Sequence, residues 1–296
     1  MLDANTYRDE YLDAEAPKLK DISLIQNLAE ISKFGTPAIF EFNSNMKPIW
    51  RRPFNKKYLN QRIGNLHISK YRNWFISLNS FHFNLLKGIN CNSLHYDARH
   101  IRGLNAFWID CDVEKNHVDF ELFWKLLPSI LQNARLPEPS FVDFSGHGYH
   151  LIWLFDKQVP VNDWKYRRRE WHSVIIRIWF SVMESITKRF NEASFSLGLP
   201  PLADVSVINP NRIIRLPGSW NHKPREYRSP SPVKTVISKH NRRINMFKAY
   251  RQYVDPHYIK APLGSKNKRN YAKLANQRSN SHHNFRIDTG HNARLH

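Results

Sequence analysis

The chain has 296 residues, which is enough for one large domain or two small ones with a proper apolar core. A content of 41% hydrophobic and 13% aromatic residues indicates a globular protein rather than a disordered one, and no apolar run is long enough to span a bilayer. Lys and Arg outnumber Asp and Glu by 45 to 25, giving a formal charge of +20, which favours a polyanionic partner such as nucleic acid.

The number of cysteines and the N-terminal sequence both indicate the cellular compartment. The only two cysteines, Cys91 and Cys111, argue against a disulfide framework and favour a reducing cytoplasm. The first 21 residues are acidic and lack an apolar core, so they do not form a signal peptide. We therefore expect a cytoplasmic protein without a membrane partner.

The positive charge is divided between a tail and the structured region. Residues 261–296 are basic, polar and without apolar periodicity, which predicts a disordered tail. The segments WKYRRREWH and NRRINMFKAYRQY are equally basic but lie among periodic, apolar stretches. The charge therefore predicts nucleic-acid contacts in the folded part as well.

In chain order, apolar residues at helical spacing over residues 21–34 predict a helix that Gly35 ends. Strands follow at PAIFEF (37–42), at WFISLNSF (74–81) and at AFWIDCDV (106–113). Residues 118–134 predict a helix that Pro128 kinks or shortens.

The second half of the chain begins with SFVDF and YHLIWLF, which are separated only by SGHG and predict a hairpin. A long helix opened by the caps Asn162 and Asp163 follows. Its expected core residues are Trp171, Val174, Ile175, Ile178, Val182 and Ile186. A turn-rich segment (203–223) and a final strand at PVKTVIS (232–238) complete the pattern, which predicts an α+β fold.

The stretch at 106–113 carries the first chemical signal. In a strand, successive side chains point to opposite faces, so Asp110 and Asp112 lie side by side on one face. Like charges that close repel and raise each other's pKa unless a positive charge lies near them. The pair therefore predicts a cationic partner.

The second signal is FSGHGYHLIW, residues 144–153. Gly146 and Gly148 allow a tight turn whose backbone N–H groups can cradle an anion. His150 begins the following strand, on the face of Ile152 and Leu154. On this evidence alone, a structural histidine is the more common outcome.

The third signal is ADVSVINPNRIIRLPGSWNHK, residues 203–223. Asp204 is its only acid, and three cations follow within a short span: Arg212, Arg215 and Lys223. Solvated charges on a surface loop would explain the composition, but so would a site for metal and phosphate.

Taken in order, these signals resemble the motifs of the archaeo-eukaryotic primase superfamily, in particular the primase–polymerases of plasmids, phages and other mobile elements. The hDhD strand is matched by residues 109–112, the sGxGxH turn by residues 145–150, and the carboxylate with an RxPGxxNxK-like segment by Asp204 and residues 215–223. The resemblance covers about residues 104–240. It implies a primase catalytic core in which an RRM-like sheet module (104–260) packs against an N-terminal α/β module (1–103), followed by the tail (261–296).

The resemblance also implies roles for these residues in a DNA-dependent nucleotidyltransferase that makes or extends strands on single-stranded DNA. Asp110, Asp112 and Asp204 would hold Mg²⁺ or Mn²⁺ for two-metal phosphoryl transfer, with His150 as a further catalytic residue. The residues that would contact the phosphates of the incoming nucleoside triphosphate are Ser145, Gly146, Gly148, His150, Arg215, Asn221 and Lys223.

Two features of many relatives are not found in the sequence. A zinc knuckle would need four ligands, and CNSLHYDARH offers only Cys91, His95 and His100. The chain has no GxxxxGK[ST] loop, so a replicative helicase would have to act in trans.

Three alternatives stay open. A rolling-circle initiator or nickase would bind metal through two histidines, but that chemistry requires a spacing of two, whereas His147 and His150 are three apart. A non-catalytic RRM-like module would stack bases on Phe107 or Trp153, but would leave two acids facing a polyanion. A repair or end-joining polymerase that only extends primers would carry the same motifs as a primase.

Overall fold

A computed structural model describes residues 22–43, 48–54, 68, 72–82, 100–161, 174–222, 231–239 and 241–254. Residues up to Val254 form one compact unit, which contains every element named below, and Asp255–His296 form a second. The predicted tail therefore lies outside the described residues, and the predicted boundary at residues 103/104 stays a prediction. In the described part of the chain, every helix is too short or too polar to cross a bilayer.

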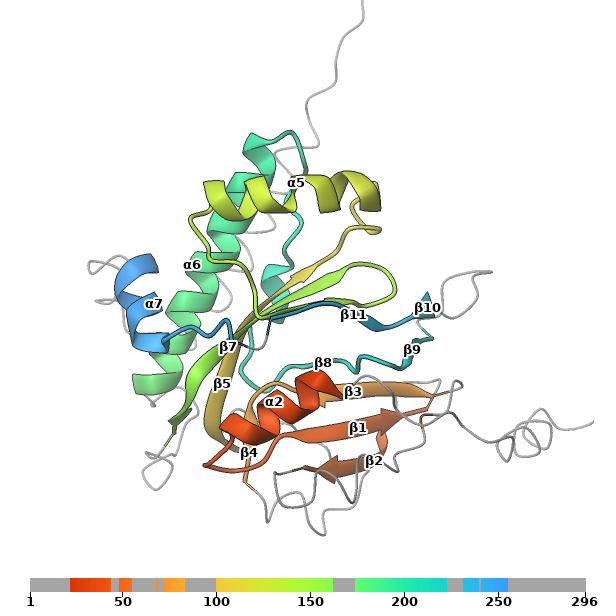
Figure 1. Cartoon of the computed structure of the whole chain (residues 1–296), viewed down its shortest axis with the longest axis vertical. Helices are drawn as coiled ribbons and strands as arrows, with labels where there is room; N and C mark the ends of the chain where they lie inside the picture. Colours follow the sequence, from red (N-terminus) through yellow and green to blue (C-terminus); the bar gives the residue numbers. More distant parts are fainter. Residues whose placement is uncertain are drawn as a thin grey trace, which may run out of the picture. The chain divides into compact units, whose positions relative to one another are not determined.

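The centre of the first unit is an antiparallel sheet of five strands in the order β11-β6-β7-β5-β4 (Figure 1). Its strands are β4 (Ser80–Phe81), β5 (Ile101–Cys111), β6 (Phe141–Phe144), β7 (Tyr149–Pro160) and β11 (Lys234–Ser238). Apolar residues on both faces of β5 are buried, which matches its nearly continuous hydrophobic sequence. β6 and β7 form the predicted hairpin.

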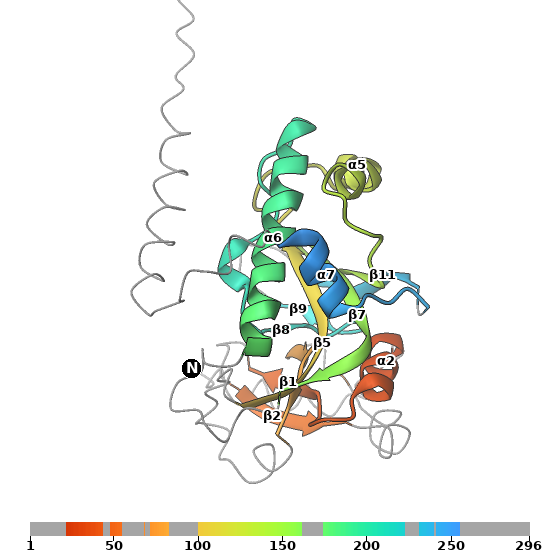
Figure 2. The same cartoon turned by 90° about the vertical axis from the view of Figure 1, so that its left-hand side faces the viewer.

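The helix α6 (Val174–Ser196) packs against β5, with α5 (Phe120–Asn133) and α7 (Met246–Tyr253) beside α6 (Figure 2). The helix α2 (Ser23–Ile31) contacts the same sheet at β7. α5 begins where the Asp119 side chain accepts a hydrogen bond from the Leu122 N–H at 2.9 Å. The Tyr149 ring of β7 stacks on Phe123 of α5, with ring centroids 5.1 Å apart. The elements β5, α5, β6, β7 and α6 follow one another in the chain, and β11 joins the sheet beside β6 after three short strands that belong to other sheets, so the α+β prediction is confirmed.

The second sheet has four antiparallel strands in the order β2-β1-β3-β8. Its strands are β1 (Ala38–Phe42), β2 (Pro48–Pro53), β3 (Asn73–Ser77) and β8 (Ile213–Arg215), preceded in the chain by α2 (Ser23–Ile31). β8 comes from the third motif, so a distant segment completes the N-terminal sheet. A 3-10 turn, η5 (Val205–Val207), and a short ribbon of β9 (Trp220–Asn221) and β10 (Ser231–Pro232) lie on either side of β8 in the chain.

A network of buried side-chain amides links the segment after β3 to β4, β5 and β7. The Asn105 side chain, at an irregularity in β5, donates to the Leu78 carbonyl at 2.9 Å and to Ser80 Oγ at 3.1 Å. Gln158 Nε2 donates to the same Ser80 oxygen at 2.8 Å and to Asn105 Oδ1 at 2.9 Å. Because buried polar groups are costly unless they are paired, this network fixes one arrangement of β4, β5 and β7.

Several element predictions need correction. Val174, expected in the core, is 54% exposed, and α6 instead buries Ile176, Trp179 and Met183 together with the expected Val182 and Ile186. α5 continues through Pro128 to Asn133. The basic segment at 241–253 contains α7, which was not predicted. The predicted caps Asn162 and Asp163, and Trp171, lie outside the described residues.

Candidate active site

The two acids of the first motif lie at the C-terminal end of β5, one on each side of its last residue, Cys111. Asp110 lies in β5 directly across from His150 of β7, and β5 ends one residue later at Cys111. Asp112 therefore begins the loop, where its carbonyl accepts a hydrogen bond from the Asn116 side chain at 2.6 Å. Their side chains are only 23% and 26% exposed, so the pair is partly shielded from water.

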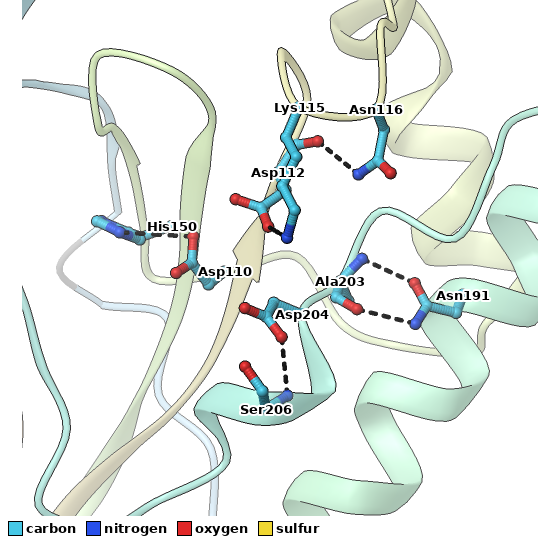
Figure 3. Close-up of polar contacts among 9 residues, drawn as sticks. All are labelled: Asp110, Asp112, Lys115, Asn116, His150, Asn191, Ala203, Asp204 and Ser206. Atoms are coloured by element: carbon cyan, nitrogen blue, oxygen red, sulfur yellow. Dashed lines mark hydrogen bonds and ion pairs between the residues drawn. The ribbon is translucent and has the colours of Figure 1, made fainter. Parts of the chain in front are cut away.

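Backbone pairing brings the third acid to the same place. The Asp112 N–H donates to the Leu202 carbonyl at 2.9 Å, and the Asp204 N–H donates to the Asp110 carbonyl at 3.0 Å. Between them, Cys111 and Ala203 form an antiparallel bridge. Residues 92 positions apart thus gather three carboxylates around the end of β5 (Figure 3).

A side chain of α6 fixes the segment that carries Asp204. Asn191 donates to the Ala203 carbonyl at 3.0 Å and accepts from the Ala203 N–H at 2.7 Å (Figure 3). Asp204 itself caps the 3-10 turn, since one of its oxygens accepts from the Ser206 N–H at 2.8 Å. Asp204 lies in a loop, but hydrogen bonds at the preceding residue, Ala203, and at the following turn fix its position.

The structure places a lysine, Lys115, beside the three acids, which supplies the cationic partner predicted from the sequence. Lys115 Nζ lies 2.9 Å from Asp112 Oδ2. The hydrogen bond and the charge of Asp112, and more weakly the charges of Asp204 and Asp110, raise the pKa of Lys115. One ammonium group thus interacts with all three carboxylates.

The donor chemistry fits a divalent metal, because carboxylate oxygens are the ligands that Mg²⁺ and Mn²⁺ prefer. As the side chains stand, no three His, Cys, Asp or Glu groups among the described residues are close enough to hold an ion. Lys115 bonds one Asp112 oxygen and the Ser206 N–H bonds one Asp204 oxygen. The remaining oxygens of Asp112 and Asp204, with Asp110, are the groups that would hold the metal.

His150 is a buried, neutral imidazole beside the acids. It is 4% exposed, and burial, followed by the charges of Arg212 and Arg215, lowers its pKa to about 3, against a smaller raising effect of Asp112. Its Nε2 atom lies 3.8 Å from Asp110 Oδ1, so no ion pair forms near neutral pH. Its Nδ1 atom is buried and has no hydrogen-bond partner among the described residues. The ring therefore has unused hydrogen-bonding capacity.

The glycine turn packs directly against the loop that carries Asp112. A Cβ atom at Gly148 would lie 2.0 Å from the Cys111 carbonyl oxygen, so only glycine fits. Gly146 has a φ of 95° and faces the Asn221 side chain, which donates to the Ser145 carbonyl at 2.7 Å. The turn is thus anchored on two sides.

A further pair joins this turn to the β5 loop. His147 Nδ1 contacts Glu114 Oε2, and the Glu114 N–H donates to the His147 carbonyl at 3.1 Å. His147 and His150 therefore point to different partners and do not converge on a common ion. The bases of a strand cannot stack on Phe107 or Trp153 either, because these rings are only 1% and 3% exposed.

The cations of the third motif are placed differently from one another. Arg215 is 9% exposed, contacts Asn73 Oδ1 through Nη1 and lies over the Phe75 ring at 4.4 Å, and burial lowers its pKa to about 10. Its charge and that of Arg212 reach His150, which lies on the other sheet. Lys223 lies outside the described residues.

Whether Cys91, His95 and His100 bind zinc stays open for the same reason. Cys91 and His95 lie outside the described residues, while His100 lies just before β5, and its carbonyl accepts from the His82 N–H at 3.0 Å.

The sequence interpretation did not include Lys115, Asn191 or Asn73. The spacing of three between Asp112 and Lys115 is a usable signal, because residues three apart lie together in a turn. Asn191 and Asn73 act across the fold on residues 12 and 142 positions away, and no local pattern indicates them.

No protein-family model matches the chain, and no curated protein matches it. The solved structures that are similar to it include the AEP domain of the cyanophage S-2L primase-polymerase, at 15% identity over 81% of this chain and 100% of that one, with a TM-score of 0.49. They also include primase RepB′ (11% identity, 87% and 68%, TM-score 0.46) and the catalytic domain of primase RepB′ in complex with initiator DNA (10% identity, 78% and 92%, TM-score 0.41). At these identities and TM-scores the similarity assigns no role to a residue, so the roles below are argued from this chain alone.

Proposed function

We propose that the chain is a DNA-dependent nucleotidyltransferase, a primase–polymerase that synthesises or extends strands on single-stranded DNA. The observation that carries the proposal is the pairing of residues 202–204 with the end of β5, which gathers Asp110, Asp112 and Asp204. Three carboxylates at one point repel one another, so their gathering is unfavourable unless a cation lies among them. They do suit the binding of metal and nucleoside triphosphate.

In this proposal the residues divide the work of phosphoryl transfer. The three aspartates hold Mg²⁺ or Mn²⁺, which when bound supplies activation of the 3′-hydroxyl and neutralisation of the triphosphate charge. His150, a neutral imidazole whose Nε2 atom lies 3.8 Å from Asp110 Oδ1, donates a hydrogen bond from Nε2 to a phosphate oxygen beside the aspartates.

The remaining groups position the nucleotide. Arg215 supplies a fixed, partly desolvated positive charge, because Asn73 and the Phe75 ring hold its guanidinium. The N–H groups of the turn at Gly146 and Gly148 suit a phosphate. Ser145 and Lys223 complete the proposed set, while Asn221 acts through the turn because its amide group is bound to the Ser145 carbonyl.

The partners follow from charge and from the motifs. A net charge of +20 suits a single-stranded DNA template, with nucleoside triphosphates as substrates. We place this activity in the replication of a plasmid, phage or other mobile element in the cytoplasm, with any helicase acting in trans.

Incubation with a single-stranded template, labelled nucleotides and Mg²⁺ or Mn²⁺ tests the proposal. Parallel reactions with and without a primer separate a primase from a polymerase that only extends. We expect metal-dependent incorporation that chelation with EDTA abolishes. Nicking of the template with covalent attachment of the protein, and no incorporation, would instead favour the rolling-circle alternative.

A further inference from the structure

Lys115 is a cation built into a site that the proposed function assigns to metal. Its ammonium group lies 2.9 Å from an Asp112 oxygen, while its side chain is 60% exposed. Figure 3 shows it between the carboxylates of Asp112 and Asp204. Lys115 is thus a positive charge in direct contact with Asp112, one of the three acids of the cluster.

The loop around Lys115 is built without its side chain. The Asn116 side chain bonds the Asp112 carbonyl at 2.6 Å, and the Val118 N–H bonds the Val113 carbonyl at 3.1 Å. The exposed lysine stem fills no core space. The contribution of Lys115 is therefore its charge, and a substitution there leaves the loop and the fold intact.

We propose that Lys115 is an internal counter-ion of the three-carboxylate site, which a divalent metal displaces from Asp112 when it binds. The inference rests on the proposed function, since it requires that metal binds there. An ammonium group and a divalent cation repel each other when both lie against the Asp112 carboxylate, even where they bind different oxygens of it. Lys115 thus lowers the repulsion among the acids of the metal-free protein and weakens metal affinity.

Calorimetric titration of Mn²⁺ into the full-length protein tests the competition. Lys115→Met should bind Mn²⁺ about three- to tenfold more tightly than wild type, the range expected for removing an exposed ion pair beside the site. Lys115→Arg keeps the charge and should remain within about twofold of wild type. The gain should shrink in high salt, which screens exposed charges.

Lys188→Met is a matched control. Lys188 also forms an exposed pair with a carboxylate, since its Nζ atom lies 3.7 Å from Glu192 and its side chain is 72% exposed. Its removal changes the net charge equally, but its ion pair is with Glu192 rather than with one of the three aspartates, so Mn²⁺ affinity should stay unchanged. Equal gains in both variants would show a general charge effect and overturn the inference.

Chemical labelling gives a readout that does not depend on activity. Acetylation of lysines, followed by mass spectrometry, should modify Lys115 faster when saturating Mn²⁺ is present, because displacement frees its amine, while Lys188 should react at a constant rate. Mn²⁺ binding with an unchanged Lys115 rate and an unchanged Lys115→Met affinity would refute the counter-ion and leave the metal site standing. Failure of the wild-type protein to bind Mn²⁺ would refute both.

Discussion

At the residue scale, His150 illustrates how burial decides chemistry. A histidine after a glycine turn suggests a charge-assisted contact to phosphate, but the ring is buried and its pKa is lowered to about 3. In the metal-free protein it is therefore a neutral donor. Its contact with phosphate is still a hydrogen bond to a charged group, which is worth about 1.5–3 kcal/mol.

We predict that His150→Ala raises the nucleotide KM and lowers kcat, with a combined loss of about 10- to 100-fold in kcat/KM. Steady-state incorporation kinetics measure this. Mn²⁺ affinity, measured by calorimetry, should hardly change, because the ring bonds none of the three aspartates as placed. A large loss of Mn²⁺ affinity would make His150 a metal ligand.

The same burial predicts acid sensitivity. The pKa of His150 is about 3 in the folded chain and about 6.5 in the unfolded chain, so only the unfolded chain binds this proton between those pH values. This stability is fully present above pH 6.5 and is lost as the pH falls, by about 1 kcal/mol per pH unit. Urea unfolding from pH 7 to pH 5 should therefore show a shallower loss for His150→Gln than for wild type. His117→Asn, at an exposed histidine, should keep the wild-type slope.

The positions of some single residues could be predicted from the sequence, but the contacts that bring them together could not. The pairing of Asp110 with Asp112 could be predicted from strand spacing, whereas Asp204 was joined to them only through the resemblance to the primase motifs. The reason they meet, the double hydrogen bond of Asn191 to Ala203, joins a helix to a loop, and no spacing in the sequence encodes it.

At the scale of elements, β5, α5 and the β6–β7 hairpin could be predicted because their periodicity is strong and their turns are short. The prediction of which side of α6 is buried was partly wrong. Apolar residues occur all round this helix, so spacing alone could not distinguish the exposed Val174 from the buried Ile176. α7 was missed because its charges hid the apolar spacing of Met246, Ala249 and Tyr253, which the structure buries.

The contact between the glycine turn and β5 gives a prediction for the hairpin. Gly148→Ala places a methyl group 2.0 Å from the Cys111 carbonyl, so the end of β5 must move, at a cost of about 2–3 kcal/mol in unfolding free energy. Because Asp110 and Asp112 flank Cys111, incorporation should fall as well. Urea unfolding and incorporation measure the two effects.

Gly198→Ala is the control for backbone conformation alone. Gly198 has a φ of 80°, but nothing lies within 4 Å of the position that an added methyl group would take, so this variant should lose about 1 kcal/mol and keep its activity. A Gly148→Ala protein as stable and active as Gly198→Ala would contradict the anchoring of the turn on β5.

At the scale of the whole molecule, each of the two sheets contains a strand from the part of the chain that forms most of the other sheet. β8 of the third motif pairs with β3, so a segment far along the chain completes the N-terminal sheet, and β4 pairs with β5, so the strand that follows β3 joins the other sheet. Sequence patterns predict strands but not their partners, because every strand presents the same backbone groups. The pairing of β8 with β3 places Arg215 and Asn73 together and near His150, which no local motif indicates.

The basic tail belongs to this scale as well. Its Lys and Arg residues, with Tyr271 and Phe285, predict non-specific phosphate contacts. Deletion of residues 264–296 should weaken single-stranded DNA binding and flatten its salt dependence, since fewer counterions are released. Fluorescence anisotropy at several salt concentrations measures this. A loss of incorporation at saturating template would contradict a role confined to binding.

The central claim is that three carboxylates from two distant segments form one catalytic metal site. Asp204→Asn tests it most directly, because Asp204 reaches the site only through the pairing of residues 202–204 with β5, and Asp156→Asn, at an exposed acid of β7, is its charge-matched control. The measurement is nucleotide incorporation, with single-stranded DNA binding followed in the same samples. We predict a loss of incorporation on the order of 10³-fold for Asp204→Asn, with DNA binding preserved and Asp156→Asn unaffected. Near-normal incorporation by Asp204→Asn would contradict the three-carboxylate site.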